Sequence, residues 1–127
     1  MNENEIGKII VDRAVRLHKA LGPGLLETVY EVVLANRLQQ AGLTVKRQVP
    51  IPIVFDGIHF DEGFRADLVV NTKVIVELKS VEHISKAHEK QVLTYLKLTG
   101  MKLGYLLNFG EAVMKDGISR IINGTIE

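Results

Sequence analysis

The 127-residue sequence has no cysteine, no tryptophan and only three prolines. Without cysteine, the chain can form neither disulfide bonds nor a thiolate metal site. No apolar run approaches the roughly 20 residues that a membrane helix needs. The opening residues, MNENEIGKII, also lack the basic head and apolar body of a signal peptide. We therefore expect a cytoplasmic protein with no membrane partner.

The sequence also lacks a dominant charge, because its formal net charge is only +1. Charge alone therefore does not indicate nucleic-acid binding, and any basic surface must be local. Lysines do crowd the C-terminal half, where a solvated helix face explains most of them. Apolar residues make up 46% and charged residues 24%, which is typical of a globular protein. This length and composition predict a single domain over residues 1–127.

Two helices are predicted in the first third of the chain. Apolar residues recur at helical spacing through 4–21, so one face of this segment is expected to be buried. The sequence Gly-Pro-Gly at 22–24 ends that helix, because proline and paired glycines oppose its continuation. A second helix is predicted over about 25–41, with Gly42 as its C-terminal cap.

From residue 43 the spacing of apolar residues becomes that of a strand, which is predicted to run to Phe55. Prolines at 50 and 52 cannot donate to a ladder, so this strand is expected at a sheet edge or with a bulge. Asp56-Gly57 predicts a hairpin, and 61–63 predicts another turn. Two further strands are predicted at 64–70 and 73–80.

The remaining elements are a helix and two strands. Ser85 is a suitable N-cap for a helix that runs to about Thr99 and ends at Gly100. A short buried strand is predicted at 103–109 and a weaker one at 118–122. The predicted fold class is α/β or α+β, with a central mixed β-sheet flanked by helices.

Charged residues interrupt two of the apolar strands. Apolar residues occupy both faces of 74–79, as in a central strand that is covered on both sides, and Glu77 and Lys79 share one face. Asp67 directly precedes the apolar run 68–70 in the same way. A buried carboxylate is costly unless it is paired. Extension of Glu77 and Lys79 past the sheet end into water remains an alternative explanation.

The loop between these strands decides whether the two carboxylates meet. A two-residue loop at 71–72 puts Glu77 on the face opposite Asp67, whereas a three-residue loop at 71–73 sets the two residues directly across from each other. Because Asn71 tolerates the left-handed conformation, we predict the three-residue loop or an equivalent bulge. Carboxylates about 5 Å apart repel each other, and a divalent cation such as Mg²⁺ or Mn²⁺ removes that penalty.

Several motifs together give the sequence a resemblance to a known family. The segment 24–30 reads G-x-x-E-x-x-Y, and it is followed by Arg-Ala-Asp at 65–67, Val-Glu-Leu-Lys at 76–79, Gln-x-x-x-Tyr at 91–95 and Leu-Asn-Phe-Gly at 107–110. In this order they resemble the GxxExxY proteins, a family placed in the PD-(D/E)XK nuclease superfamily. One departure is that Ala66 stands where the superfamily's name has proline.

The resemblance implies a restriction-endonuclease-like core and a role for Glu27 as a third metal-binding carboxylate beside Asp67 and Glu77. Glu27 and Tyr30 are three residues apart, so both fall on one helix face, and Tyr30 becomes a candidate for substrate contact. A first-turn acid favoured by the helix dipole is the plainer interpretation of Glu27. The carbonyl of Leu78 completes the implied set of metal ligands.

Gln91 and Tyr95 lie four apart on one helical face and resemble the Q-x-x-x-Y motif of RecB-type nucleases. Gln91 is then expected near the metal, and Tyr95 near the substrate backbone or the catalytic lysine. Packing of the Tyr95 ring into the core is an equally good alternative. His83 and His88 are interpreted as surface or structural residues.

We therefore expect a nuclease that uses Mg²⁺ or Mn²⁺ to hydrolyse phosphodiester bonds in nucleic acid, with DNA as the favoured substrate. Lys79 is expected to position the attacking water and to stabilise charge on the phosphate. The alternative is a catalytically silent nuclease-fold module that binds nucleic acid or a protein partner. Because so small a domain offers little surface for recognition, a homodimer or a partner protein is a further expectation.

Overall fold

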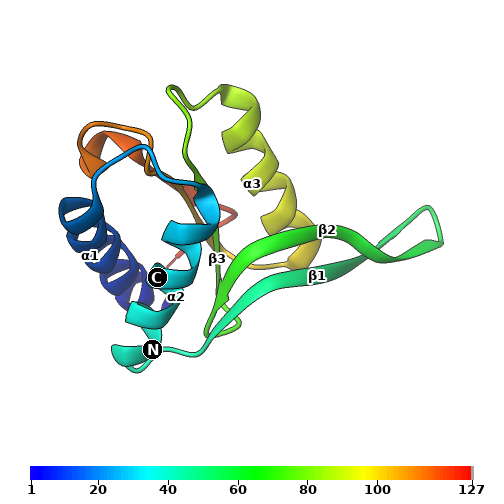
Figure 1. Cartoon of the computed structure of the whole chain (residues 1–127). Coiled ribbons are helices and arrows are strands. Elements are labelled where there is room, and N and C mark those ends of the chain that lie inside the picture. Colours follow the sequence, from blue (N-terminus) through cyan, green and yellow to red (C-terminus); the bar gives the residue numbers. More distant parts are fainter. Residues whose placement is uncertain (127) are drawn as a thin grey trace.

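The computed structural model describes residues 1–126 and consists of a five-stranded mixed sheet with helices on both faces (Figure 1). The helices are α1 (Glu3–Leu21), α2 (Glu27–Gln40) and α3 (Lys86–Thr99), with a short 3₁₀ helix η1 (Met114–Gly117). The strands are β1 (Val45–Phe55), β2 (Ile58–Val70), β3 (Val74–Lys79), β4 (Leu103–Asn108) and β5 (Ile118–Ile122). This α+β architecture confirms the predicted class and is consistent with a restriction-endonuclease-like fold.

The strands lie in chain order, β1-β2-β3-β4-β5, and only β3 and β4 are parallel. The connection between these two strands contains α3, as a parallel pair requires. β3 lies at the centre of the sheet, and all of its residues up to Leu78 are buried. The prediction of a central strand that is covered on both sides is confirmed.

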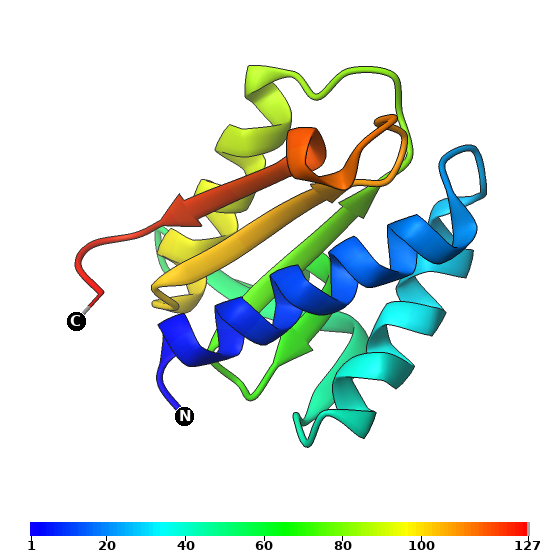
Figure 2. The ribbon, with the colours of Figure 1, turned by 90° about the vertical axis from the view of Figure 1, so that its left-hand side faces the viewer.

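Two separate apolar cores fix the layers. The larger core packs α1 and α2 against one face of the sheet and includes Val74, Val76 and Leu78 from β3. The smaller core packs α3 against the other face and includes Ile75. Figure 2 looks onto the face that α1 crosses, with α3 behind the sheet. Because side chains alternate along a strand, Glu77 and Lys79 point to the α3 face with Ile75.

The predicted helix ends agree with the structure to within about two residues. α1 begins with a capping box in which the Asn2 side chain accepts from the Glu5 backbone, and Ser85 caps α3. α2 begins at Glu27 instead of residue 25, and its C-cap is Ala41, one residue before the predicted Gly42.

The predicted turn at 61–63 is wrong, because β2 runs without interruption from Ile58 to Val70. The acidic and glycine residues there form an irregularity in the β1–β2 ladder, which shifts register between Ile51 and Ile53. Of the two predicted alternatives for β1, a sheet edge or a bulge, the edge position is confirmed, since β1 has one neighbour and the extra residues at the register shift belong to β2.

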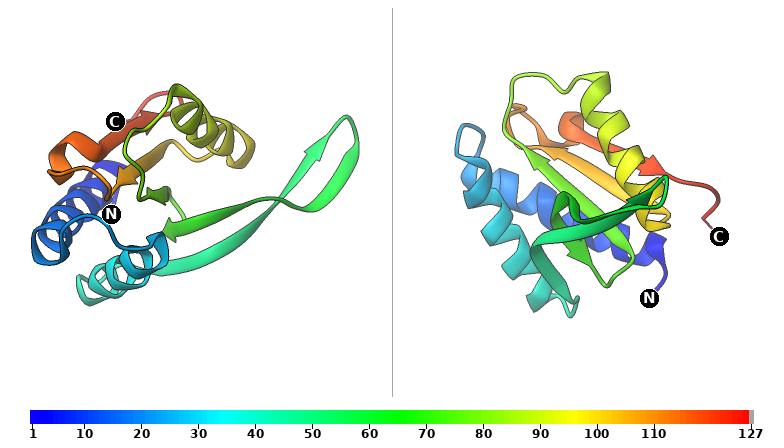
Figure 3. Two further views of the ribbon diagram at one scale, coloured as in Figure 1. Left: turned by 45° about the horizontal axis from the view of Figure 1, so that its top comes forward. Right: turned by 90° about the vertical axis from the view of Figure 1, so that its right-hand side faces the viewer.

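The β1–β2 hairpin extends well beyond the body of the molecule (Figure 3). Its outer part exposes several large apolar side chains, with Phe55 64% and Ile58 58% exposed at the pair that closes the turn. No helix in residues 1–126 has both the length and the hydropathy needed to cross a membrane.

Candidate metal centre and active site

The carboxylates of Asp67 and Glu77 meet where β2 separates from β3. The turn between these strands comprises residues 71–73, Val70 pairs with Val74, and Asn71 has a φ of +50°. The prediction of a three-residue loop is confirmed. The ladder ends at the pair Leu68–Val76, and the next two residues in this register are Asp67 and Glu77.

Beyond the last pair of the ladder, the two carboxylates accept hydrogen bonds from backbone N–H groups of the opposite strand. The backbone N–H of Asp67 donates to Oε2 of Glu77 at 2.7 Å, and the backbone N–H of Leu78 donates to Oδ2 of Asp67 at 2.9 Å. Each acid is therefore bonded to the opposite strand. These bonds engage one oxygen of each carboxylate and hold the pair between the strands.

β2 also changes face at this point. Leu68 and Val70 pack into the larger core, whereas Ala66, two residues before Leu68, packs into the core beneath α3. Regular alternation would put Ala66 on the same side as Leu68. β2 is thus twisted at Asp67, the first residue beyond the last β2–β3 pair.

Burial makes this site electrostatically unusual. Glu77 is only 5% exposed, and burial, followed by the nearby charge of Asp67, raises its pKa to about 8. The backbone N–H of Asp67 and the charge of Lys79 act in the opposite direction but do not cancel these effects. At neutral pH without a cation, the pair therefore holds a proton that two ordinary carboxylates would have lost.

Lys79 lies on the same side of β3 as Glu77 and is half-buried. Its ammonium group is close enough to lower the pKa of Glu77. The alternative that both side chains simply extend into water does not hold for Glu77, because that carboxylate is buried.

α3 brings Tyr95 to the carboxylates. The Tyr95 ring stacks on Phe64 of β2, with centroids 3.7 Å apart and ring planes inclined by 6°. The pKa of Tyr95 is raised by burial and then by the charges of Glu77 and Asp67, while the side chain of Gln91 acts to lower it. The structure shows that the Tyr95 ring is packed on Phe64 and that its hydroxyl is near enough to Glu77 and Asp67 for their charges to raise its pKa.

Glu27, the expected third carboxylate, is bonded to the backbone just after β3. It is the first residue of α2 and is exposed, and its Oε1 accepts from the backbone N–H of Ser80 at 3.3 Å. Ser80 in turn donates from Oγ to the Leu25 carbonyl at 2.7 Å. Glu27 therefore lies at the end of β3. Within residues 1–126, however, no three Asp, Glu, His or Cys side chains gather closely enough to hold a metal ion.

Tyr30 does not fit the predicted substrate contact, and we correct that assignment. Its side chain is fully buried, stacked on Phe109 with ring centroids 4.4 Å apart. Its hydroxyl donates to the Gly22 carbonyl at 2.6 Å and accepts from the Leu25 N–H at 3.1 Å. Tyr30 therefore anchors the loop before α2 and has no surface for a substrate.

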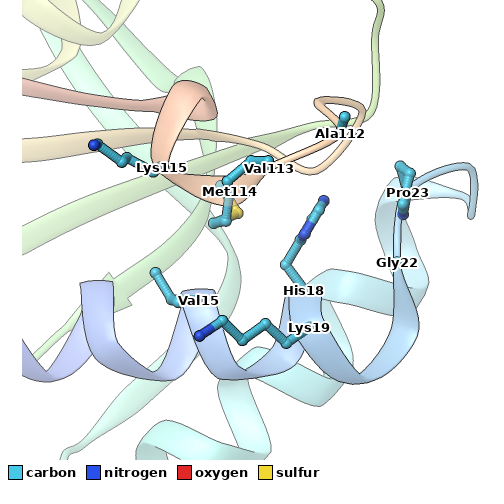
Figure 4. A pocket seen from close by; sticks show the side chains of 9 residues that line it. All are labelled: Val15, His18, Lys19, Gly22, Pro23, Ala112, Val113, Met114 and Lys115. Carbon is cyan, nitrogen blue, oxygen red and sulfur yellow. The ribbon is translucent and has the colours of Figure 1, made fainter.

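The histidines do not contribute to the carboxylate site. His88 caps α3 by accepting from the Ser85 N–H through Nδ1, and His83 is exposed. His18 is buried and bonds the Glu111 carbonyl at 2.8 Å beside a hollow of about 540 Å³ (Figure 4). That hollow lies between the end of α1 and the loop before η1, and it includes none of the predicted site residues.

Sequence reasoning missed a polar cluster on the other side of Asp67. Glu31 of α2 is 5% exposed and bonds both Arg47 and Gln48 of β1, and Gln48 also approaches Asp67. Glu31 could have been noticed, because it falls on the buried face of α2. Gln48 offers no such signal, since nothing in the residue type announces its positive φ.

The comparison with known families matches residues 4–121 to a family model described as the PD-(D/E)XK nuclease superfamily. The match includes every residue of the carboxylate site. No curated protein matches the chain.

Proposed function

The chain belongs to the PD-(D/E)XK nuclease superfamily, and we propose that it is an active, metal-dependent nuclease that hydrolyses phosphodiester bonds in DNA. Membership of this superfamily supports a nuclease-type function, nucleic acid as a partner and the use of divalent metal ions. The motifs of the GxxExxY proteins support assignment to that family within it. The site supports a single catalytic domain over residues 1–127.

One observation carries the proposal: Asp67 and the buried Glu77 are held together at the open end of a ladder, although burial and the charge of Asp67 both oppose ionisation of Glu77. Two ionised carboxylates this close repel each other, and a bound cation removes that penalty. The donor set consists of oxygens, which suit Mg²⁺ or Mn²⁺.

Asp67, Glu77 and the Leu78 carbonyl would hold the metal. The N–H of Leu78 points to Asp67, and the N–H and C=O of one strand residue point the same way, so the Leu78 carbonyl also faces the opening. Glu27 would join through rotation of its exposed side chain away from Ser80. A bound divalent cation supplies charge stabilisation on the phosphate and lowers the pKa of water.

The remaining roles belong to residues around the opening. The Lys79 ammonium orients the attacking water and stabilises negative charge on the phosphate oxygens. The Tyr95 hydroxyl, whose pKa is raised by burial and by the charges of both carboxylates, donates to the substrate backbone, and the exposed Gln91 lies on the same helix face.

The test is cleavage of labelled single- and double-stranded DNA and RNA with Mg²⁺, Mn²⁺ or EDTA. Wild-type protein is expected to cut DNA only with metal, whereas Glu77→Ala and Lys79→Ala, although folded by circular dichroism, are expected not to cut. Cleavage retained in both variants would refute the mechanism. Cleavage of RNA alone would change the substrate but keep the mechanism.

A second candidate is a catalytically silent module that binds nucleic acid or a protein partner. Two observations favour it: Glu27 is turned to Ser80, and backbone N–H groups already satisfy one oxygen of each of the other two acids. Calorimetric titration with Mn²⁺ separates the candidates, since the silent module predicts either no binding or binding that Asp67→Ala leaves unchanged.

A further inference from the structure

A chain of polar contacts leads from α2 to Oδ1 of Asp67, the carboxylate oxygen that does not bond the Leu78 N–H. The guanidinium of Arg47 donates twice to Oε2 of Glu31, from Nε at 3.1 Å and from Nη2 at 2.8 Å. The other oxygen of Glu31 accepts from Nε2 of Gln48 at 2.7 Å. The same Nε2 lies 3.4 Å from Oδ1 of Asp67. One amide nitrogen thus bridges two carboxylates.

The chemistry of the groups fixes how this amide is turned. Both neighbours of Gln48 are carboxylates, which accept hydrogen bonds when ionised, and only the NH₂ side of an amide donates. The opposite orientation would place the amide oxygen against two anionic oxygens. Glu31 is 5% exposed and its Oε2 accepts from two nitrogens of Arg47, so charge-assisted bonds hold this end of the bridge in place.

The backbone of Gln48 is also unusual. Its φ is +50°, a conformation that residues other than glycine, asparagine and aspartate rarely adopt. Regular β1–β2 pairs surround it, Arg47 with Leu68 and Val49 with Ala66, and Asp67 is the residue that faces Gln48 in this register. The strained residue therefore lies opposite the acid whose strand changes face.

We propose that Gln48, anchored by Glu31 and Arg47, is a positioning residue that fixes the orientation of the Asp67 carboxylate. With Oδ1 directed by Gln48 and Oδ2 by the Leu78 N–H, the plane of the carboxylate is defined from both sides. A backbone conformation that is rare for glutamine is explained by this function, since the positive φ directs the amide into the space between Glu31 and Asp67. The expected effect of Gln48 on metal affinity rests on the proposed function, whereas its effect on the orientation of the Asp67 carboxylate does not.

The test uses Gln48→Met, which keeps side-chain length and backbone strain but removes the donor. The matched control is Gln40→Met, the same exchange at an exposed position near the end of α2. Hydrogen exchange of the Leu78 amide in EDTA reports the bond to Oδ2 of Asp67, and the amide of Val76, inside the regular ladder, reports the sheet. Isothermal titration with Mn²⁺ reports the metal site.

Gln48→Met is expected to accelerate exchange at Leu78 several-fold but not at Val76, and to weaken Mn²⁺ binding roughly 10- to 100-fold, as loss of an outer hydrogen bond to a ligand does elsewhere. Gln40→Met is expected to change neither. Glu31→Gln, which does not touch Asp67, is expected to show the same pattern in weaker form. This variant also serves if Gln48→Met does not fold.

Unchanged exchange at Leu78 in Gln48→Met would overturn the positioning role. Faster exchange at Leu78 and Val76 together would also overturn it, because that pattern indicates general loosening of the sheet. Faster exchange at Leu78 alone, with Mn²⁺ binding that neither Gln48→Met nor Asp67→Asn alters, would support positioning while refuting the proposed function. The two proposals therefore fail separately.

Discussion

The raised pKa of Glu77 predicts an unusual dependence of stability on pH in the absence of metal. Its ordinary pKa is 4.5, and in the folded chain the value rises to about 8. Between these values the folded chain binds a proton that the unfolded chain has released, so the free energy of unfolding falls as pH rises. The stability is fully present below pH 4.5 and is lost as pH rises to about 8. This direction is opposite to that of an ion-paired carboxylate.

The magnitude follows from the two pKa values, since each pKa unit corresponds to 1.36 kcal/mol. A rise from 4.5 to about 8 gives a loss of at most about 5 kcal/mol for the pair of Asp67 and Glu77. A domain of this size has a total stability of about 5–15 kcal/mol, so the effect is large enough to measure.

Urea unfolding in EDTA from pH 4.5 to 9 measures this loss of unfolding free energy with rising pH. Glu77→Gln is expected to flatten the curve and to be more stable than wild type at pH 9, because a neutral amide still accepts from the Asp67 N–H. Asp61→Asn, an exposed change in the hairpin, is expected to follow wild type. Saturating Mn²⁺ should stabilise wild type most at high pH and Glu77→Gln little. A Glu77→Gln curve parallel to that of wild type would refute the reasoning.

Three further predictions concern neighbouring residues. Lys79→Met should abolish cleavage but leave calorimetric Mn²⁺ affinity within about threefold of wild type. Lys79 is not among the proposed metal ligands, and the hydrogen bonds that hold Asp67 and Glu77 remain. A complete loss of binding would contradict its assigned role. Tyr30→Phe should lower the urea-derived unfolding free energy by about 1–3 kcal/mol, because the Gly22 carbonyl and the Leu25 N–H lose their partner, without changing the KM for DNA. Gly110→Ala should destabilise by roughly 1–3 kcal/mol in the same assay, since its Cβ would lie 2.1 Å from the Val81 carbonyl oxygen; unchanged stability would show that this loop can move.

The sequence predicted the fold through features that are local. Apolar spacing, capping residues such as Ser85 and the change from helical to strand period located nearly every element. The turn at 61–63 was mispredicted because Asp, Glu and Gly favour turns, whereas here pairing with β1 across a shifted register keeps these residues in the strand.

Within the site, the sequence could predict which residues of two paired strands face each other, because this depends only on the length of the loop between them. The loop 71–73 follows from the tolerance of Asn71 for positive φ, and that loop alone puts Asp67 across from Glu77. The position of Tyr30 could not be read in this way, because helix spacing shows which residues share a face but not whether that face is buried. Its ring is packed against Phe109, which follows β4 far along the chain.

The contacts around Asp67 show why the rest of the site escaped prediction. Asp67 is bonded by Glu77 and Leu78 of the next strand, and on its other side Gln48 comes from the strand before it. Sequence patterns show which residues repeat at a regular spacing. The irregular backbone at Gln48 in β1 and at Asp67 in β2, which face each other, interrupts that spacing and leaves no pattern to detect. If Gln48 orients Asp67, the irregular backbone at this level has a physical reason. A regular β1–β2–β3 ladder would pair every backbone group and leave the two carboxylates no donors to direct them.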